Sequence, residues 1–344
     1  MESTTIRLRI HSYLTAELRQ IPQQVRLAES LGFDGVVASE LAHDPFFPLL
    51  LAAEHSTRLQ LLSGVAIAFA RNPMLLAQSA HDLNAFSSGR FTLGLGSQIK
   101  AHITRRFSMP WSHPAARMQE MIGAIRAIFA TWYDGKPLDF QGEFYTHTLM
   151  TPMFSPTDIE FGKPPIWLAA VGSLMTQVAG AVADGVMLHS FTTEAYVRAH
   201  TLPDLHAGLD SQKRPRDACR VCCTPFMAIG EDAETLQSAR RAVMQRIAFY
   251  ASTPAYRPVL DQHGWGELQP RLQELTKEGR WAELASLITA EMLETFAAVG
   301  TPSQVANLVW QRYGNVADDL VLASEVNSPQ TLAAIAAEIR TLAA

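Results

Sequence analysis

The chain has 344 residues, of which 48% are hydrophobic and 18% charged, with a formal net charge of −5. This composition is typical of a globular protein with a large core, and no basic block indicates nucleic-acid binding. The N-terminal residues MESTTIRLRIHSYL lack the charged and apolar regions of a secretory signal, and no apolar run is long enough to cross a bilayer. We therefore expect a cytoplasmic protein without nucleic-acid or membrane partners.

Short apolar segments and amphipathic segments alternate along almost the whole chain. Because several of the apolar segments carry no polar face, they predict parallel strands that are covered on both sides by helices. The pattern predicts a (β/α)8 TIM barrel that forms one domain over residues 1–344. Strands are predicted at residues 6–14, 33–40, 59–69, 90–97, 164–170, 184–191, 220–230 and 318–324.

The predicted helices between these strands have clear start signals. Asn72-Pro73, Thr301-Pro302 and Ser328-Pro329 each place a capping side chain before a proline at the first helical position, and Asp44-Pro45 does the same. Helices are predicted at about residues 18–31, 45–55, 115–132, 173–182 and 232–250, with two more from 73 and 329 onwards.

Two long segments do not fit the repeat. Residues 133–163 follow the fourth helix, and residues 251–300 follow the seventh. Both contain aromatic residues, so we expect ordered insertions that build the substrate pocket or a lid. The stretch 276–300 has a helical pattern that would otherwise thicken the outer layer.

The three cysteines do not predict a metal or redox centre. Cys219, Cys222 and Cys223 lie in a predicted strand, where residues three apart point to opposite faces. We expect buried thiols, no disulfide framework and no metal site.

The active site of such a barrel lies at the C-terminal ends of its strands. Gly94-Leu95-Gly96-Ser97-Gln98 follows the fourth strand and predicts either close backbone approach to a planar ligand or tight packing. The turn at Ala169-Ala170-Val171-Gly172-Ser173 opens a helix, whose free N–H groups suit a phosphate. Other candidates at this rim are His11, Tyr13, Glu40, His43 and His189.

Several of these segments together resemble the luciferase-like monooxygenase superfamily, especially the branch that uses the deazaflavin coenzyme F420. The matching segments are SELAHDPFFPLLLAAEHSTRLQL, RNPMLLAQ with SSGRFTLGLG, PPIWLAAVG, ADGVMLHS and MLETFAAVGTPSQVA. The resemblance implies a barrel that binds F420 or FMN with the ring at its mouth. It also implies a cis peptide at Gly64-Val65, behind the ring. The implied cofactor-binding residues are His11, Gly64, Val65, Ala66, Ser97, Gln98, Val171, Gly172, Ser173 and Leu174.

The chain departs from the sugar-phosphate dehydrogenases of this branch. Ser39-Glu40-Leu41 stands where these enzymes have an Asp-His pair, and Gln98-Ile99 stands where they have a glutamate. Proton handling is therefore assigned to Glu40 or His43.

Three functions stay open at this point. The first is F420-dependent hydride transfer with a small organic substrate, in which Lys100, Arg105 and Arg106 either meet the acidic tail of the cofactor or form a solvated loop. The second is an FMN-dependent monooxygenase, and the third is a flavin-binding barrel without turnover. By analogy with the family we expect a homodimer.

Overall fold

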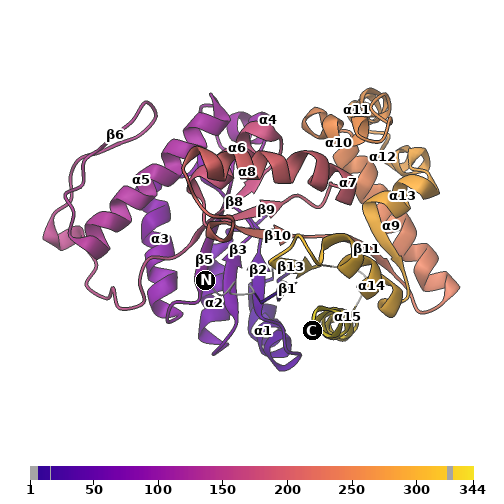
Figure 1. The fold of residues 1–344 in the computed structure, drawn as a ribbon, viewed down its shortest axis with the longest axis horizontal. Helices are drawn as coiled ribbons and strands as arrows, with labels where there is room; N and C mark the ends of the chain where they lie inside the picture. The colour runs from indigo at the N-terminus through magenta and orange to yellow at the C-terminus, as the bar shows by residue number, and fades with distance from the viewer. Residues whose placement is uncertain (1–6, 16, 324–327) are drawn as a thin grey trace.

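Eight parallel strands close into a barrel in the computed structural model, which describes residues 7–15, 17–323 and 328–344 (Figure 1). The pairing runs in one circle, and the pairing of β3 with β5 closes it. The predicted TIM barrel is thus confirmed, although residues 6 and 324, predicted as strand ends, lie outside the described residues. The barrel strands are β1 (Arg9–Tyr13), β2 (Gly35–Ala38), β3 (Gln60–Ser63) with β4 (Ala66–Ile67), β5 (Phe91–Gly96), β8 (Ile166–Ala170), β9 (Gly185–Leu188), β10 (Arg220–Cys223) and β13 (Asp319–Leu322).

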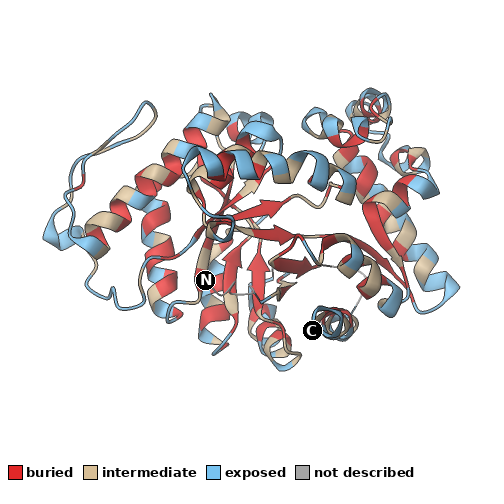
Figure 2. Cartoon of the chain, in the orientation of Figure 1, coloured by how far each residue is buried: buried red, intermediate tan, exposed pale blue. Residues whose placement is uncertain are grey.

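Helices cover the outside of the barrel and turn their buried faces toward the strands (Figure 2). Three predicted caps are present, because the side chains of Asn72, Thr301 and Ser328 accept backbone N–H groups in the first turn. The segment between β9 and β10, for which no helix was predicted, contains the short α7 (Glu194–Tyr196) and the longer α8 (Leu202–Ser211). The outer helices are α1 (Ile21–Ser30), α2 (Phe46–Glu54), α3 (Pro73–Phe86), α5 (Pro114–Asp134), α6 (Ser173–Val182), α8 (Leu202–Ser211), α14 (Pro302–Tyr313) and α15 (Pro329–Ala343); α4 (Lys100–Arg105) and α7 (Glu194–Tyr196) are short.

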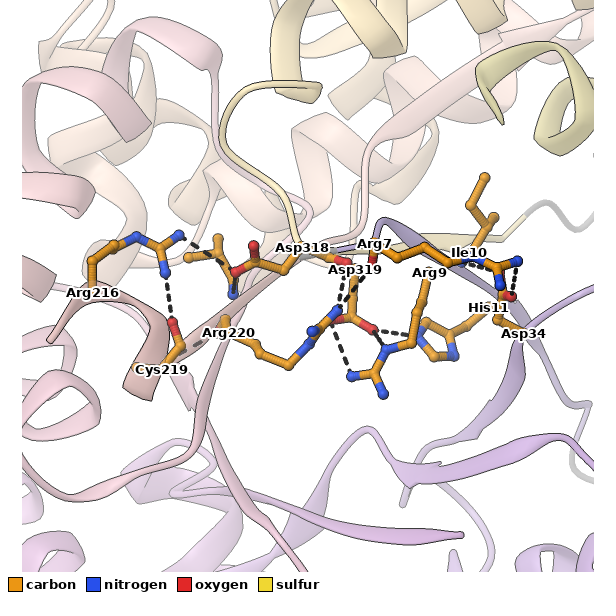
Figure 3. A network of polar contacts seen from close by, with 11 residues as sticks. Arg7, Arg9, Ile10, His11, Asp34, Arg216, Cys219, Arg220, Asp318 and Asp319 are labelled. Carbon is orange, nitrogen blue, oxygen red and sulfur yellow. Dashed lines mark hydrogen bonds and ion pairs between the residues drawn. The ribbon is translucent and has the colours of Figure 1, made fainter. Parts of the chain in front are cut away.

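The barrel interior has an apolar layer and a charged layer. Val37, Leu62, Trp167, Met187, Cys222 and Val321 pack together in the apolar layer. At the N-terminal ends of the strands, the fully buried Asp319 accepts hydrogen bonds from Arg9 Nε at 2.8 Å and Arg220 Nε at 2.6 Å (Figure 3). This layer fills the base of the barrel with paired charges.

The predicted seventh strand, residues 220–230, is wrong as one continuous strand. Only β10 belongs to the barrel, and Pro225, which has no N–H to donate, separates it from β11 (Phe226–Ile229). β11 leaves the barrel and pairs in parallel with β12 (Ala297–Gly300). The helix predicted for residues 276–300 is therefore also wrong at its end, because the small apolar residues there fit a buried strand as well as a helix.

The predicted third strand, residues 59–69, is likewise interrupted. β3 ends at Ser63, and β4 resumes at Ala66 and pairs with β5. A 3₁₀ turn at Ala68–Ala70 then ends the segment, so the last predicted residues are not extended.

The first insertion forms a hairpin of β6 (Phe140–Gln141) and β7 (Thr146–His147) that projects from the end of the molecule away from β11 (Figure 1). Glu120 on α5 holds it by accepting the N–H groups of Glu143, Phe144 and Tyr145. None of its described residues lines the cleft described below, so the predicted pocket or lid role is not seen for this insertion.

The second insertion packs around a second hydrophobic cluster beside the barrel. Its helices are α10 (Arg257–Asp261), α11 (Leu268–Lys277), α12 (Trp281–Leu284) and α13 (Ala290–Phe296), and they pack with α9 (Ala233–Ala251) and β11. Within the described ranges, no helix is long and apolar enough to span a membrane.

Candidate active site

The break between β3 and β4 forms a bulge at the rim of the barrel. The Gly64-Val65 peptide bond is cis, which confirms the prediction. The side chain of Val65 packs closely against Gly96 of β5. A Cβ built on Gly96 would lie only 2.6 Å from Val65 Cγ2, so only glycine leaves room for this contact. Ala66 pairs with Leu95, so the bulge lies beside the end of β5. Ser97 and Gln98 directly follow this strand, and the predicted residues of these two segments are therefore neighbours.

The two predicted proton carriers lie in different surroundings. Glu40 is buried beside the bulge, and its Oε2 accepts the N–H of Ile67 at 2.7 Å. His43 is exposed on the loop that connects β2 to α2. The structure therefore places Glu40 in contact with the bulge, whereas His43 is exposed and its role stays a prediction.

The turn after β8 presents backbone donors to solvent. The first hydrogen bond of α6 joins Thr176 N–H to Gly172 O at 3.2 Å, so the amides of Ser173, Leu174 and Met175 precede it. Gly172 has φ +78°, and a Cβ there would meet no atom within 4 Å. Val171 and Leu174 are exposed beside it. An open turn with unpaired amides at a helix N-terminus fits a phosphate group.

The side chain of Ser173 is already engaged. Its hydroxyl donates to Asp204 Oδ1 at 2.7 Å, and Gln177 Nε2 donates to the same oxygen at 3.0 Å. A phosphate at this turn would therefore be held by backbone N–H groups, with the Asp204 carboxylate close by.

A solvent-open cleft adjoins this turn, between the ends of β8 and β9 and the second insertion. Its lining includes one carboxylate, Asp204, two histidines, His189 and His200, and no lysine or arginine. The cleft thus offers amides, hydroxyls and imidazoles rather than fixed positive charges.

His189 at the end of β9 is held in one tautomer. The Phe191 N–H donates to its Nδ1 at 3.0 Å, so a neutral ring carries its proton on Nε2. The ring stacks on Tyr256, with centroids 4.7 Å apart, and meets the edge of Tyr250. Burial, together with the nearby Arg246 cation, lowers the pKa of His189 to about 4. His189 is therefore a neutral hydrogen-bond donor at physiological pH.

The second insertion forms one side of the cleft, and its substrate-binding role stays a prediction. Ala255 and Val259 line it. Two hydrogen bonds, both 2.8 Å long, fasten the insertion to the segment after β9. One joins His200 Nε2 and Gln262 Oε1, and the other joins Thr193 Oγ1 and His263 Nε2.

Residues 3–319 match the family model described as "Luciferase-like monooxygenase". The chain belongs to the luciferase-like monooxygenase family. It is 46% identical over 312 residues to an uncharacterized protein of Mycobacterium tuberculosis (91% of this chain, 92% of the relative). It is 28% identical over 293 residues to the 5,10-methylenetetrahydromethanopterin reductase of Archaeoglobus fulgidus, and the alignment covers 83% of each chain.

The fold is also that of a solved member of this group. The F420-dependent tetrahydromethanopterin reductase of Methanopyrus kandleri superposes with a TM-score of 0.79 and 20% identity over 97% of both chains. A solved riboflavin lyase, described in complex with a modified FMN, also has this fold, with a TM-score of 0.68 and 14% identity over 98% of this chain and 91% of that chain. The predicted family is thus confirmed.

His11 lies apart from the other residues assigned from the resemblance. It is buried in the charged layer, where its Nε2 is 2.7 Å from Asp319 Oδ1. Its register partners are Gly35 and Val321, at the start of β2 and within β13, whereas the bulge follows the end of β3. Its cofactor-binding role stays a prediction, and its contacts in this structure are with the base of the barrel (Figure 3).

Two residues of the site were not found from the sequence. In the sequence, Arg71 stands out only as part of the RNPMLLAQ segment. Its place two residues before a helix-opening proline is the one signal that could have identified it. Asp204 had no signal, because it lies on α8, a helix that was not predicted.

Proposed function

We propose that this luciferase-like protein is an F420-dependent oxidoreductase that transfers hydride between the deazaflavin and a small organic molecule. The charge of the cleft carries this proposal. FMN ends in a phosphomonoester with a charge of about −1.5 to −2 at pH 7, whereas F420 is joined to its tail by a phosphodiester with one negative charge. A turn with backbone amides, the Asp204 carboxylate and no lining lysine or arginine favours the less charged group.

The residues of the rim fit this cofactor in a simple division of roles. The amides of Ser173, Leu174 and Met175 would hold the phosphodiester, and Val65 in the bulge would support the ring. When bound, the deazaflavin supplies the hydride chemistry, while the barrel supplies orientation and proximity.

The proton accompanying the hydride needs a group at the edge of the site. We assign it to His43, because this side chain is exposed, whereas Glu40 is buried and paired. His189, held as a neutral ring, would donate its Nε2–H to an oxygen of the bound molecule.

The basic residues after β5 are consistent with a cofactor that has an acidic tail, as F420 has. Among the described residues, Lys100 and Arg105 have no ion-pair partner, and both are exposed. Arg106 instead donates to the backbone oxygen of Leu41. Lys100 and Arg105 are thus the better candidates for contact with the tail.

Titration of the purified protein with F420 and with FMN, followed by fluorescence, tests the proposal. We expect F420 to bind at least tenfold more tightly than FMN, and raised salt to weaken F420 binding by screening the tail contacts. Tighter binding of FMN would overturn the cofactor assignment.

An FMN-dependent monooxygenase is the second candidate, supported by the description of the family model and by the insertion that forms one wall of the cleft. Oxygen chemistry requires a pocket that excludes water, and this wall would help to exclude it once cofactor and substrate are bound. Substrate-dependent oxygen consumption with reduced FMN would establish this function. A barrel that binds cofactor without turnover is the third, and it gains support if no substrate ever oxidises the reduced cofactor.

We also propose a homodimer. Phe47 on α2 and Leu75 and Phe86 on α3 are exposed apolar side chains on two helices that pack side by side. Sedimentation of the wild type and of Phe47→Ser checks this proposal, and a wild type that sediments as a monomer would contradict it.

A further inference from the structure

The bulge between β3 and β4 is gripped by residues that the proposed hydride transfer does not use. Glu40 holds it at two points, because its backbone N–H donates to Val65 O at 3.1 Å and its Oε2 accepts the N–H of Ile67 at 2.7 Å. The two contacts lie on either side of Ala66. One residue thus fixes the path of the chain directly after the cis bond.

Arg71 completes the grip from the other end of the segment. Its Nη1 donates to the same Oε2 of Glu40, and its Nη2 donates to Asp44 Oδ2 at 2.7 Å. The guanidinium carbon lies 5.5 Å from the ring centroid of Phe46, which restricts it further. Arg71 is 18% exposed and Glu40 7%, so solvent screens this ion pair weakly.

Further hydrogen bonds from the end of β2 hold the backbone on both sides of the cis bond, next to Val65, the residue that would face the cofactor. Ser39 Oγ donates to Gly64 O, and Gly64 N–H donates to Ala38 O at 2.8 Å. Val65 is thus held on the β2 side by Ser39 and Glu40, and its side chain rests on Gly96 of β5. A shift at Ile67 would be passed directly to Val65.

The same geometry does not favour proton transfer through Oε2 of Glu40. Two N–H donors already occupy this oxygen, and delivering a proton there would displace the Ile67 amide or the Arg71 guanidinium. A buried amide or cation left without its acceptor is costly.

We propose that Glu40 and Arg71 are a positioning pair that holds Val65 at the height required to support the flat ring of the bound cofactor. The inference rests on the proposed function, since the ring is what Val65 would support. Glu40 acts through the bulge, and the ring contact belongs to Val65.

Cofactor titrations of full-length variants test the pair. We expect Glu40→Ala and Arg71→Met each to weaken binding of the preferred cofactor about tenfold and to shift its bound absorption band. The double variant should be no weaker than the worse single variant, because the two residues act as one unit. Glu40→Gln keeps an oxygen for the Ile67 amide and should stay within about threefold of wild type. Arg126→Met, which breaks an exposed pair with Asp184, is the control and should bind normally.

The outcomes distinguish a failure of the positioning pair from a failure of the proposed function. If the wild type prefers F420 and all variants bind it equally with unchanged spectra, the positioning pair is refuted and the proposed function stands. If the wild type prefers FMN, the proposed function is refuted, and the FMN titrations of the variants still test the pair. If the wild type binds neither, both fail. Should Glu40→Ala and Arg71→Met not fold, Arg71→Lys decides, because it loses the second donor to Asp44 and should bind about threefold more weakly; wild-type affinity in that variant overturns the inference.

Discussion

Asp319 offers a direct measure of what the charged base of the barrel contributes to stability. Burial by itself would raise the pKa of this carboxyl, but the hydrogen bond from His11 and the charges of His11, Arg9 and Arg220 lower it from 3.8 to about 2. At about 1.4 kcal/mol per pKa unit, the difference corresponds to about 2.5 kcal/mol of folding free energy. Asp319 has no exposed surface, so solvent screening removes little of it.

The sign of the effect follows from the lowered pKa. The stabilisation is complete well above pH 4, where the carboxyl is ionised in both states, and it is lost as the pH falls toward 2. We expect Asp319→Asn to lower the free energy of unfolding by about 2–3 kcal/mol at pH 7, with a difference from wild type that shrinks below pH 4.

Urea unfolding at pH 7 and at several lower pH values, followed by circular dichroism, measures this effect. Asp134→Asn breaks an exposed pair with Lys163 and should leave the urea midpoint unchanged. An Asp319→Asn variant that unfolds at the wild-type midpoint at pH 7 would refute the reasoning.

Three further predictions concern the cleft, its turn and the thiols. Asp204→Asn should raise FMN affinity about five- to tenfold more than F420 affinity, since it removes a charge near the phosphate; equal gains in the two titrations would contradict this. Gly172→Ala should lower the free energy of unfolding by about 1 kcal/mol, and with it the thermal midpoint, because φ is +78° at this residue; an unchanged midpoint would contradict this. Burial raises the pKa of Cys219 to about 12, so a thiol reagent at pH 8 should label it only after unfolding; rapid labelling of the native protein would disprove this.

The barrel could be predicted from the sequence because each strand and each capped helix carries its own local signal. Apolar runs such as GVVA in β2 and start signals such as Asn72-Pro73 depend on few neighbours. β12 could not be predicted, because Ala297 and Ala298 pack in either a helix or a strand, and only the pairing with β11 decides. The single-domain expectation stays a prediction.

The candidate site divides in the same way. The turn at Gly172 and the cis bond at Gly64-Val65 lie next to strand ends, so sequence order and the resemblance were enough to place them. The acceptor role of Glu40 toward Arg71 joins residues 31 positions apart and could not be seen from either residue alone. Asp204 reaches Ser173 in the same manner, from a neighbouring helix.

The second hydrophobic cluster gives the second insertion a core of its own, separate from the core of the barrel. The insertion that walls the cleft packs on this cluster rather than on the barrel core. A replacement at Val259, which lines the cleft and belongs to this cluster, would then disturb the smaller core and leave the barrel strands that carry the bulge and the turn unchanged. Substitutions in the insertion can therefore change the shape of the cleft while the packing of the barrel strands stays the same.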